Sequence, residues 1–182
     1  ERSTYFSPDP LLAQFPCAEH WHYTNSGWVR GHMIPAGDLK YDQEAMNDSF
    51  YTSNVCPMNM TFNNSIWKRL EEKARKWAAK YGYIYIITGP VMGQNINGKV
   101  GNSNIMIPDK FYKAVLIPYK GSFLAIGFIM DNDEGTQGKL KDYAVTIDSL
   151  DKHIGNDIFV NPPFLTAYKI ESLLPLKELE LF

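Results

Sequence analysis

Cysteine, arginine and long apolar runs are all scarce in this sequence. Cys17 and Cys56 are the two cysteines among 182 residues, too few for a disulfide framework. One bridge between them is possible, but two buried thiols are the favoured interpretation, because free cysteine is often buried. No run approaches the roughly 18 apolar residues of a membrane-spanning helix. The sequence thus excludes a scaffold built on disulfides and offers no candidate for a transmembrane helix.

Positive charge is also limited, and it is unevenly distributed. The formal net charge is −2 at pH 7, whereas a protein that holds nucleic acid by bulk charge is usually basic. Residues 64–81 nevertheless carry six Lys and Arg against two Glu, a local charge of +4. The four arginines are Arg2, Arg30, Arg69 and Arg75. Any binding of phosphate by this chain must therefore be local.

The composition is otherwise that of an ordinary globular chain, with 45% hydrophobic and 21% charged residues. Its length favours one domain over residues 1–182 with a sizeable core. No signal peptide is recognisable, and the chain begins at Glu1 rather than Met. We therefore expect a processed or trimmed product from which a signal or an anchor has been removed.

Short elements are expected in the first third of the chain. Residues 1–28 are rich in proline and predict a loop with about one helical turn at Pro10–Phe15. A short strand is predicted at Val29–Ile34 and a short helix at 42–50. A loop is predicted at 54–61, because the proline at position 57 opposes a regular continuation.

The segment His20-Trp21-His22 is a candidate metal site. In an extended segment the two histidines would share one face, where they could chelate a metal. No third ligand follows at a convincing distance, so packed or surface histidines are the favoured interpretation.

The clearest helix is predicted to begin at Asn63, Asn64 or Ser65, which are all good N-caps. Gly82 is a plausible end. Apolar residues at helical spacing lie between them: Ile66, Trp67, Leu70, Ala74, Trp77, Ala78 and Tyr81.

Strands dominate the second half. Tyr83–Thr88 is nearly all apolar, which predicts a strand buried on both faces and ended by Gly89-Pro90. Two longer strands are predicted at Phe111–Tyr119 and Ser122–Met130, joined by Lys120-Gly121. Further expected elements are a turn at Asn97-Gly98, a strand at Asp142–Val145, a helix at Asp148–Ile154 and an amphipathic segment at Phe164–Leu174. Strands so close in sequence predict an α+β domain with a central antiparallel sheet and helices packed on it.

Several residues between positions 30 and 75 suit phosphodiester chemistry. A neutral histidine such as His32 can act as a base near pH 7, and Arg30 can contact phosphate through two N–H groups. The side-chain oxygen of Asn63 is a hard ligand that suits Mg²⁺, although a helix cap is the common role of such an asparagine. Glu71 and Arg75 lie at i and i+4 and can pair on one helix face, most often as a surface salt bridge.

Asn54 lies in the predicted loop before Pro57 and could orient a water molecule or a backbone group; a turn asparagine is the ordinary alternative. The order of all these residues is more specific than any one of them. The ordered segments are Arg30-Gly31-His32-Met33, Ser53-Asn54-Val55-Cys56-Pro57, Asn63-Asn64-Ser65-Ile66-Trp67, and Leu70-Glu71 with Arg75. This pattern resembles the DNA/RNA non-specific endonuclease family, which includes the endonuclease G type and belongs to the ββα-metal (His-Me finger) nucleases.

The resemblance covers roughly residues 2–160 and implies a ββα-metal core at about 28–81. It implies that His32 is the general base. It also implies that Asn63 is the only direct protein ligand of a single Mg²⁺, for which Mn²⁺ is a possible substitute. The implied reaction is hydrolysis of DNA and RNA without sugar preference, leaving 5′-phosphate and 3′-hydroxyl ends.

The resemblance also implies supporting roles, in which Asn54 and Glu71 hold metal-bound water and Arg30 and Arg75 clamp the phosphate. One position departs from the family, because Val29 stands where members usually carry Asp before Arg-Gly-His. An upstream strand found in most members is expected to be missing, and the last 22 residues take no part in the resemblance.

Partners and location follow from this interpretation. DNA and RNA are the expected substrates, an inhibitor protein is a possible partner, and homodimers occur in the family. Because such an enzyme would harm the host's own nucleic acids, a secreted, periplasmic or cell-surface location is expected. The alternative is a degraded nuclease that binds nucleic acid or a protein partner without cutting.

Overall fold

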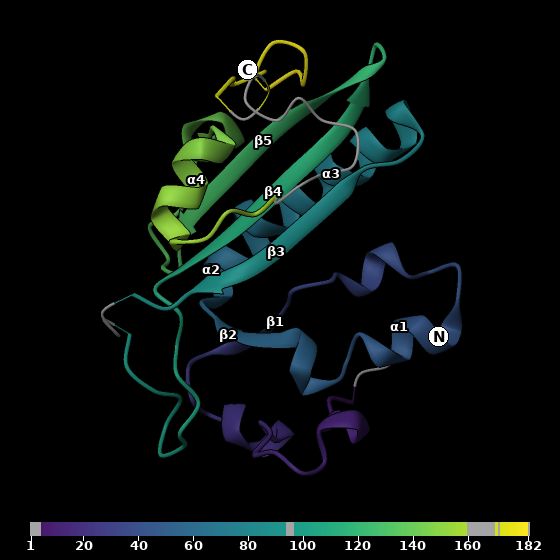
Figure 1. The fold of residues 1–182 in the computed structure, drawn as a ribbon. Coiled ribbons are helices and arrows are strands. Elements are labelled where there is room, and N and C mark those ends of the chain that lie inside the picture. Colours follow the sequence, from purple (N-terminus) through teal and green to yellow (C-terminus); the bar gives the residue numbers. More distant parts are fainter. Residues whose placement is uncertain (1–4, 94–96, 160–169, 171, 182) are drawn as a thin grey trace.

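The computed structural model describes residues 5–93, 97–159, 170 and 172–181, which form two antiparallel sheets with helices packed on them. The smaller sheet pairs strands β1 (Val29–His32) and β2 (Val55–Met58). The larger sheet has the strand order β3-β4-β5-β6. Its strands are β3 (Tyr85–Val91), β4 (Lys110–Tyr119), β5 (Ser122–Asp131) and β6 (Ala144–Val145) (Figure 1). The predicted α+β class with a central antiparallel sheet is confirmed.

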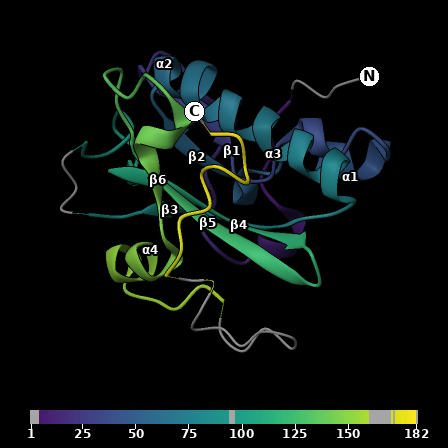
Figure 2. The same cartoon turned by 90° about the horizontal axis from the view of Figure 1, so that it is seen from above.

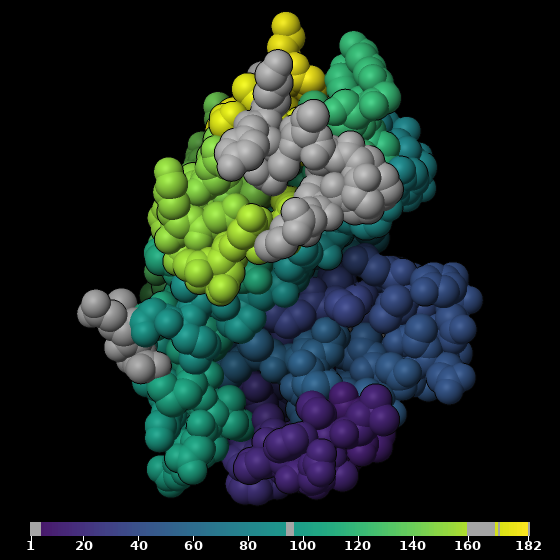
Figure 3. Space-filling view, in the orientation of Figure 1, coloured from purple at the N-terminus to yellow at the C-terminus, as the bar shows by residue number. Residues whose placement is uncertain are grey.

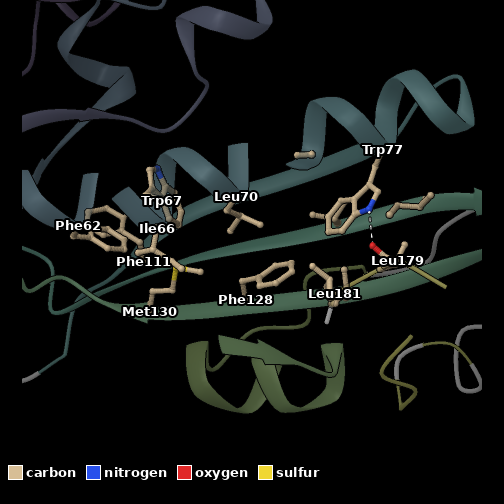
Figure 4. Packing of buried hydrophobic residues seen from close by; sticks show 14 of the residues in the cluster. Phe62, Ile66, Trp67, Leu70, Trp77, Phe111, Phe128, Met130, Leu179 and Leu181 are labelled. Carbon is tan, nitrogen blue, oxygen red and sulfur yellow. Dashed lines mark hydrogen bonds between the residues drawn. The ribbon is translucent and has the colours of Figure 1, made fainter. Parts of the chain in front are cut away.

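Helices cover the larger sheet on both faces. Helix α3 (Lys68–Tyr81) lies on one face and α4 (Ile147–Ile154) on the other, as the view from above shows (Figure 2). The main core fills the α3 side, where Trp67, Leu70 and Trp77 meet Phe111 and Phe128 of the sheet (Figure 4). Each of these five side chains is almost fully buried.

The hairpin of β4 and β5 forms as predicted. Lys120 and Gly121 connect the strands with φ angles of 48° and 76°. Positive φ at both central residues is what a type I′ hairpin turn requires, and glycine adopts it without steric cost. Likewise Gly155, at φ 73°, ends α4 in the left-handed conformation.

The prediction for β3 was wrong in two respects. Tyr85 and Ile87 are 48% and 37% exposed, so this strand is not buried on both faces. It also continues through Gly89-Pro90 to Val91. Both differences have one cause: β3 is at the edge of the sheet and pairs only with β4. An edge strand can leave one face in solvent and can tolerate a proline, because no second neighbour needs its N–H group.

The loop predicted at 54–61 was also wrong, because β2 runs directly through Pro57. Pro57 lies opposite Arg30 in the pair with β1. Its carbonyl accepts a hydrogen bond from Asn132 Nδ2 at 3.1 Å, on the side away from that partner strand. In a two-stranded sheet each strand has a free side, so the missing N–H of proline costs no ladder bond there.

The long helix begins earlier than the sequence predicted. Asn59, not a residue of 63–65, is the N-cap, and its Oδ1 accepts hydrogen bonds from the N–H groups of Thr61 and Phe62 at 2.9 and 3.2 Å. Helix α2 (Met60–Phe62) passes into a π-type turn at Asn63–Trp67 and then into α3. Asn63 is therefore not a helix cap.

The N-terminal part of the chain forms one end of the molecule and the C-terminal part the other (Figure 3). The first part contains helix α1 (Gln43–Asp48), which confirms the predicted short helix.

Cys17 and Cys56 are free thiols, so no bridge joins them. No helix among the described residues has the length and apolarity to cross a membrane. The amphipathic segment predicted at 164–174 falls largely outside the described residues.

Residues near the C-terminus pack against α3. Leu179 and Leu181 are buried in the main core, and the indole N–H of Trp77 donates to the Leu179 carbonyl at 3.2 Å. Lys80 forms a salt bridge with Glu180 at 2.6 Å. These residues thus hold the second half of the long helix against the sheet.

Candidate active site

His32 ends strand β1, and its ring is held by two aromatic side chains. The centroid of the imidazole is 5.4 Å from that of Phe6 and 4.9 Å from that of Phe50, which it meets edge-on. Side chains alternate along a strand, so His32 and Arg30 share one face of β1. Val29 points the other way and packs against the main core. The residue that departs from the family pattern is thus on the face opposite His32.

The glycine before His32 is required by packing. Gly31 is buried, and a Cβ built on it would lie 2.1 Å from Sδ of Met58, itself fully buried. We expect Gly31→Ala to lower the free energy of unfolding by roughly 1–3 kcal/mol, the usual cost of overpacking. Urea unfolding measures it, with Gly135→Ala as a control in more open space. An unchanged midpoint for Gly31→Ala would mean that Met58 can move aside.

The π-type turn sets the direction of Asn63. A turn with i→i+5 hydrogen bonds stacks residue i over residue i+5, here Asn63 over Lys68. Lys68 shares one face of α3 with Glu71 and Arg75, by its 3–4 spacing. Asn63 is half-buried, and its side chain forms no hydrogen bond within the part of the chain that the structure describes. The extra residue in the turn therefore aligns a free carboxamide with Glu71 and Arg75.

A cleft of about 420 Å³ separates this helix face from the segment that follows β1. It brings together four of the six predicted site residues: His32, Asn63, Glu71 and Arg75. The full lining is His32, Pro35, Ala36, Gly37, Lys40, Met46, Asn63, Asn64, Lys68, Glu71, Glu72 and Arg75. Arg30 and Asn54 do not line it.

Arg75 pairs with Asp38 and not with Glu71, which corrects the predicted i,i+4 pair. Its Nη1 donates to Oδ1 of Asp38 at 2.7 Å, and both side chains are partly exposed. Gly37 permits this approach, because a Cβ there would lie 3.3 Å from the same Nη1. Asp38 was not among the site residues predicted from the sequence.

Glu71 has a perturbed titration. Burial raises the pKa of its carboxyl to about 7, although the charges of Lys113 and Arg75 act to lower this pKa. Lys113, on β4, is only 1% exposed, and burial lowers the pKa of its ammonium to about 8. The sequence analysis missed Lys113. A lysine inside the apolar run Phe111–Tyr119 was the available signal, since lysine is almost never fully buried unless it is paired.

Asn54 fastens the backbone near His32. Its Nδ2 donates to the carbonyls of Ile34 and Ser49, and its Oδ1 accepts from the N–H of Ile34, each at 2.9 Å. All three hydrogen bonds of this side chain are therefore to backbone groups, on Ile34 and on Ser49. This geometry favours the alternative in which Asn54 orients a backbone group over the one in which it orients water.

Arg30 is engaged outside the cleft. Its Nη2 donates to the His20 carbonyl at 3.0 Å, and the guanidinium lies 5.3 Å from the ring centroids of both Phe6 and Tyr23. Burial lowers the pKa of Arg30. The segment His20–Tyr23 is a 3-10 turn, so the extended segment in which His20 and His22 would share one face does not form. The ring nitrogen Nδ1 of His22 instead accepts a hydrogen bond from the backbone of Glu19 at 2.8 Å.

The residues of the cleft fit a metal that retains most of its water. Among the described residues, no group of three His, Cys, Asp or Glu is placed to hold a metal ion. Asn63 offers one half-buried carboxamide oxygen with no other partner there. Mg²⁺ dehydrates reluctantly and is commonly bound through one or two protein oxygens plus water, so the donor set suits it.

Strands β1 and β2 are antiparallel and are followed by the long helix, so they form a ββα unit. His32 lies on the first strand, and Asn63 lies in the first turns of the helix. A solved chain from the EndoG/EndoGI complex matches this fold with a TM-score of 0.73 and 26% sequence identity. The match covers 85% of this chain and 69% of that one. The fold is therefore that of the ββα-metal nucleases. The family model for DNA/RNA non-specific endonucleases matches residues 1–164, and the chain belongs to that family.

Curated relatives agree with this assignment. The mitochondrial nuclease EXOG of Xenopus laevis is 35% identical over 163 residues, covering 82% of this chain and 46% of that protein. The mitochondrial nuclease 1 of Schizosaccharomyces pombe is 33% identical over 178 residues, covering 89% and 55%. The chain thus spans about half the length of the curated relatives that it matches.

The expected secreted or cell-surface location was wrong, because these relatives are mitochondrial nucleases. The prediction rested on the need to keep a nuclease away from the host's nucleic acids. Enclosure in an organelle separates an enzyme from the nucleus as export does. Composition and motifs carry no signal that distinguishes these two solutions.

Proposed function

We propose that this chain is a single nuclease domain that hydrolyses phosphodiester bonds of DNA and RNA in the presence of Mg²⁺, leaving 5′-phosphate and 3′-hydroxyl ends. One observation supports this most. The cleft gathers a histidine, an uncommitted asparagine, a half-buried glutamate and an arginine from the ββα unit of a DNA/RNA non-specific endonuclease family member. These residue types supply a base, a hard oxygen ligand, an acceptor and a cation for phosphate.

His32 is the general base of this proposal. His32 lines the cleft, and its imidazole in the neutral form takes a proton from the attacking water as the phosphate is attacked. The rings of Phe6 and Phe50 limit rotation of the imidazole, so the accepting atom keeps one direction. Asn54 adds to this by fixing the backbone of Ile34, which lies two residues beyond His32.

Asn63 would hold the metal through its side-chain oxygen. When bound, Mg²⁺ supplies positive charge that stabilises the developing charge on the phosphate and on the leaving 3′ oxygen. A neutral ligand such as a carboxamide leaves that charge undiminished. Glu71, as a carboxylate, accepts hydrogen bonds from water in the cleft and orients it.

Arg75 is the phosphate contact. Asp38 holds one end of its guanidinium through Nη1, and the remaining N–H groups are left for an anion in the cleft. Arg30 lies outside the lining, so we assign it to the support of β1 instead. Phosphate contacts carry no base information, so a site built in this way cuts without sequence preference.

Incubation of supercoiled plasmid and of a folded RNA with the purified chain tests the proposal. We expect nicking and then degradation of both with Mg²⁺, a slower reaction with Mn²⁺, and none with EDTA. End labelling should find 5′-phosphates. Retention of plasmid on the protein without any cleavage would contradict the proposal and favour a degraded nuclease that only binds.

A protein inhibitor is part of the same proposal. The structurally similar EndoG forms a complex with EndoGI in which EndoG is inhibited. We extend this kind of partner to the present chain, because its cleft has the same scaffold. An inhibitor that covers the cleft should carry acidic side chains toward Arg75, Lys68 and Lys40.

A further inference from the structure

Lys113 is a charged residue in an apolar layer. It lies in the middle of β4, and its neighbours on the same face, Phe111 and Val115, belong to the core beneath α3. The side chain is 1% exposed. A buried ammonium costs several kcal/mol unless it is paired and hydrogen-bonded, so its presence here calls for a partner.

The direct contacts of Lys113 satisfy only part of this need. Its Nζ donates to Oγ1 of Thr88, the opposite residue on β3, at 2.6 Å. The same atom lies 4.9 Å from the centroid of the Trp67 ring. Trp67 is four residues before Glu71, so the carboxylate of Glu71 lies one helical turn further along the same side. Thr88 and Trp67 are neutral, and Glu71 is the anion that acts most strongly on Lys113.

The charges near Glu71 alternate in sign. Lys113 on the sheet and Arg75 on the helix both act on Glu71, and Arg75 is bound to Asp38 on the opposite wall of the cleft. The row therefore spans β4, α3 and the segment after His32. The other charged or titratable groups that face the cleft are His32, Lys40, Lys68 and Glu72.

We propose that Lys113 is a positioning residue: a buried counter-cation beneath the cleft that holds Glu71 in its charged form. Its consequence for catalysis rests on the nuclease function proposed above, whereas its effect on Glu71 does not. Lys113 touches neither the cleft nor a substrate. It acts only through the carboxylate that faces the cleft.

The sign of the effect follows from the charges. Burial raises the pKa of Glu71 to about 7, so the carboxylate form is complete only above that pH. Lys113 and Arg75 lower this pKa, while Asp38 and Glu72 raise it. Removing Lys113 therefore raises the pKa of Glu71 further, and the charged form requires a still higher pH.

Carbon NMR of the Glu71 carboxyl group in the metal-free protein tests the pairing without any substrate. We expect Lys113→Met to raise the titration midpoint of Glu71 by about one pH unit or more, since a nearby opposite charge shifts a carboxyl pKa by 1–3 units. Lys113→Arg should restore most of the shift. Thr88→Val is the matched control, because it removes the hydrogen bond and keeps the charge. An unchanged midpoint in folded Lys113→Met would overturn the proposal.

The reciprocal variant covers the case in which Lys113→Met does not fold. In Glu71→Gln the titration midpoint of the Lys113 ammonium should fall below its value of about 8, because its anion has gone. A Lys113 midpoint that does not move in this variant would equally overturn the proposal.

The activity measurement separates this inference from the proposed function. In Lys113→Met we expect the acid limb of the rate profile for plasmid cleavage to move upward together with the Glu71 midpoint. An inactive wild-type chain with the expected NMR shifts would refute the nuclease but leave the electrostatic effect of Lys113 on Glu71 intact. An active wild type whose Lys113→Met profile does not move would refute the role of Lys113 alone.

Discussion

Replacement of His32 by alanine is expected to reduce plasmid cleavage in Mg²⁺ by roughly 10²–10⁴-fold, the usual contribution of a positioned general base. The substitution removes the one imidazole that lines the cleft. It leaves the groups that contact metal and phosphate in place. The loss should therefore appear in the rate of cleavage at saturating substrate, while the affinity for plasmid stays close to that of the wild type.

The matched control is His153→Ala. This exposed histidine lies on α4, across the sheet from α3, and its Nδ1 lies 2.7 Å from the Ser149 carbonyl oxygen. Its removal should not change the cleavage rate. Near-ultraviolet circular dichroism checks that His32→Ala keeps the aromatic packing of Phe6 and Phe50. Full activity in a folded His32→Ala protein would show that another group takes the proton.

The second large effect is expected for Asn63→Ala. If its oxygen is the one protein ligand, Mg²⁺ affinity should fall by about 100-fold or more. Mutation of a residue that only hydrogen-bonds to a metal ligand already lowers metal affinity by about 10–100-fold. Isothermal titration with Mg²⁺ measures this without substrate. Plasmid cleavage should fall in parallel and recover in part at high Mg²⁺ concentration.

Asn64→Ala provides the comparison, because Asn64 is the adjacent residue, has the same side chain and also lines the cleft. It should keep Mg²⁺ affinity within about two-fold of the wild type. This change is much smaller than the loss of affinity of about 10–100-fold that follows mutation of a residue supporting a metal ligand. Neither substitution should destabilise the helix start, because Asn59 is the cap. Equal Mg²⁺ affinity in Asn63→Ala and the wild type would remove Asn63 from the metal site.

Much of the fold follows from periodicity in the sequence. The apolar stripe from Ile66 to Tyr81 predicted α3, and the two apolar runs joined by Lys120-Gly121 predicted the hairpin of β4 and β5. Failures occurred where a neighbour decides the outcome. An all-apolar run such as β3 looks the same at the edge of a sheet as at its centre. Likewise, whether a strand tolerates Pro57 depends on which side of it is paired.

The candidate site was predictable where its residues belong to an ordered sequence pattern. His32, Asn63, Glu71 and Arg75 could be selected because an ordered pattern lies within 46 residues and the structure brings them into one cleft. Asp38 and Lys113 could not be paired with that pattern, since the partner of a charge is set by folding and not by spacing. The π-type turn could not be predicted either, because no residue type between Asn63 and Trp67 indicates a helical turn with one additional residue.

The packing of Leu179 and Leu181 onto α3 also constrains when the cleft can be completed during folding. The indole of Trp77 is hydrogen-bonded to a residue 102 positions later in the chain, and Leu179 and Leu181 close the core beneath the same helix. Contacts of such separation form late in folding, because the loop between them is costly to close. The helix that carries Glu71 and Arg75 is therefore only loosely held until Leu179 and Leu181 have packed on it. The cleft would then reach its final form only near the end of folding.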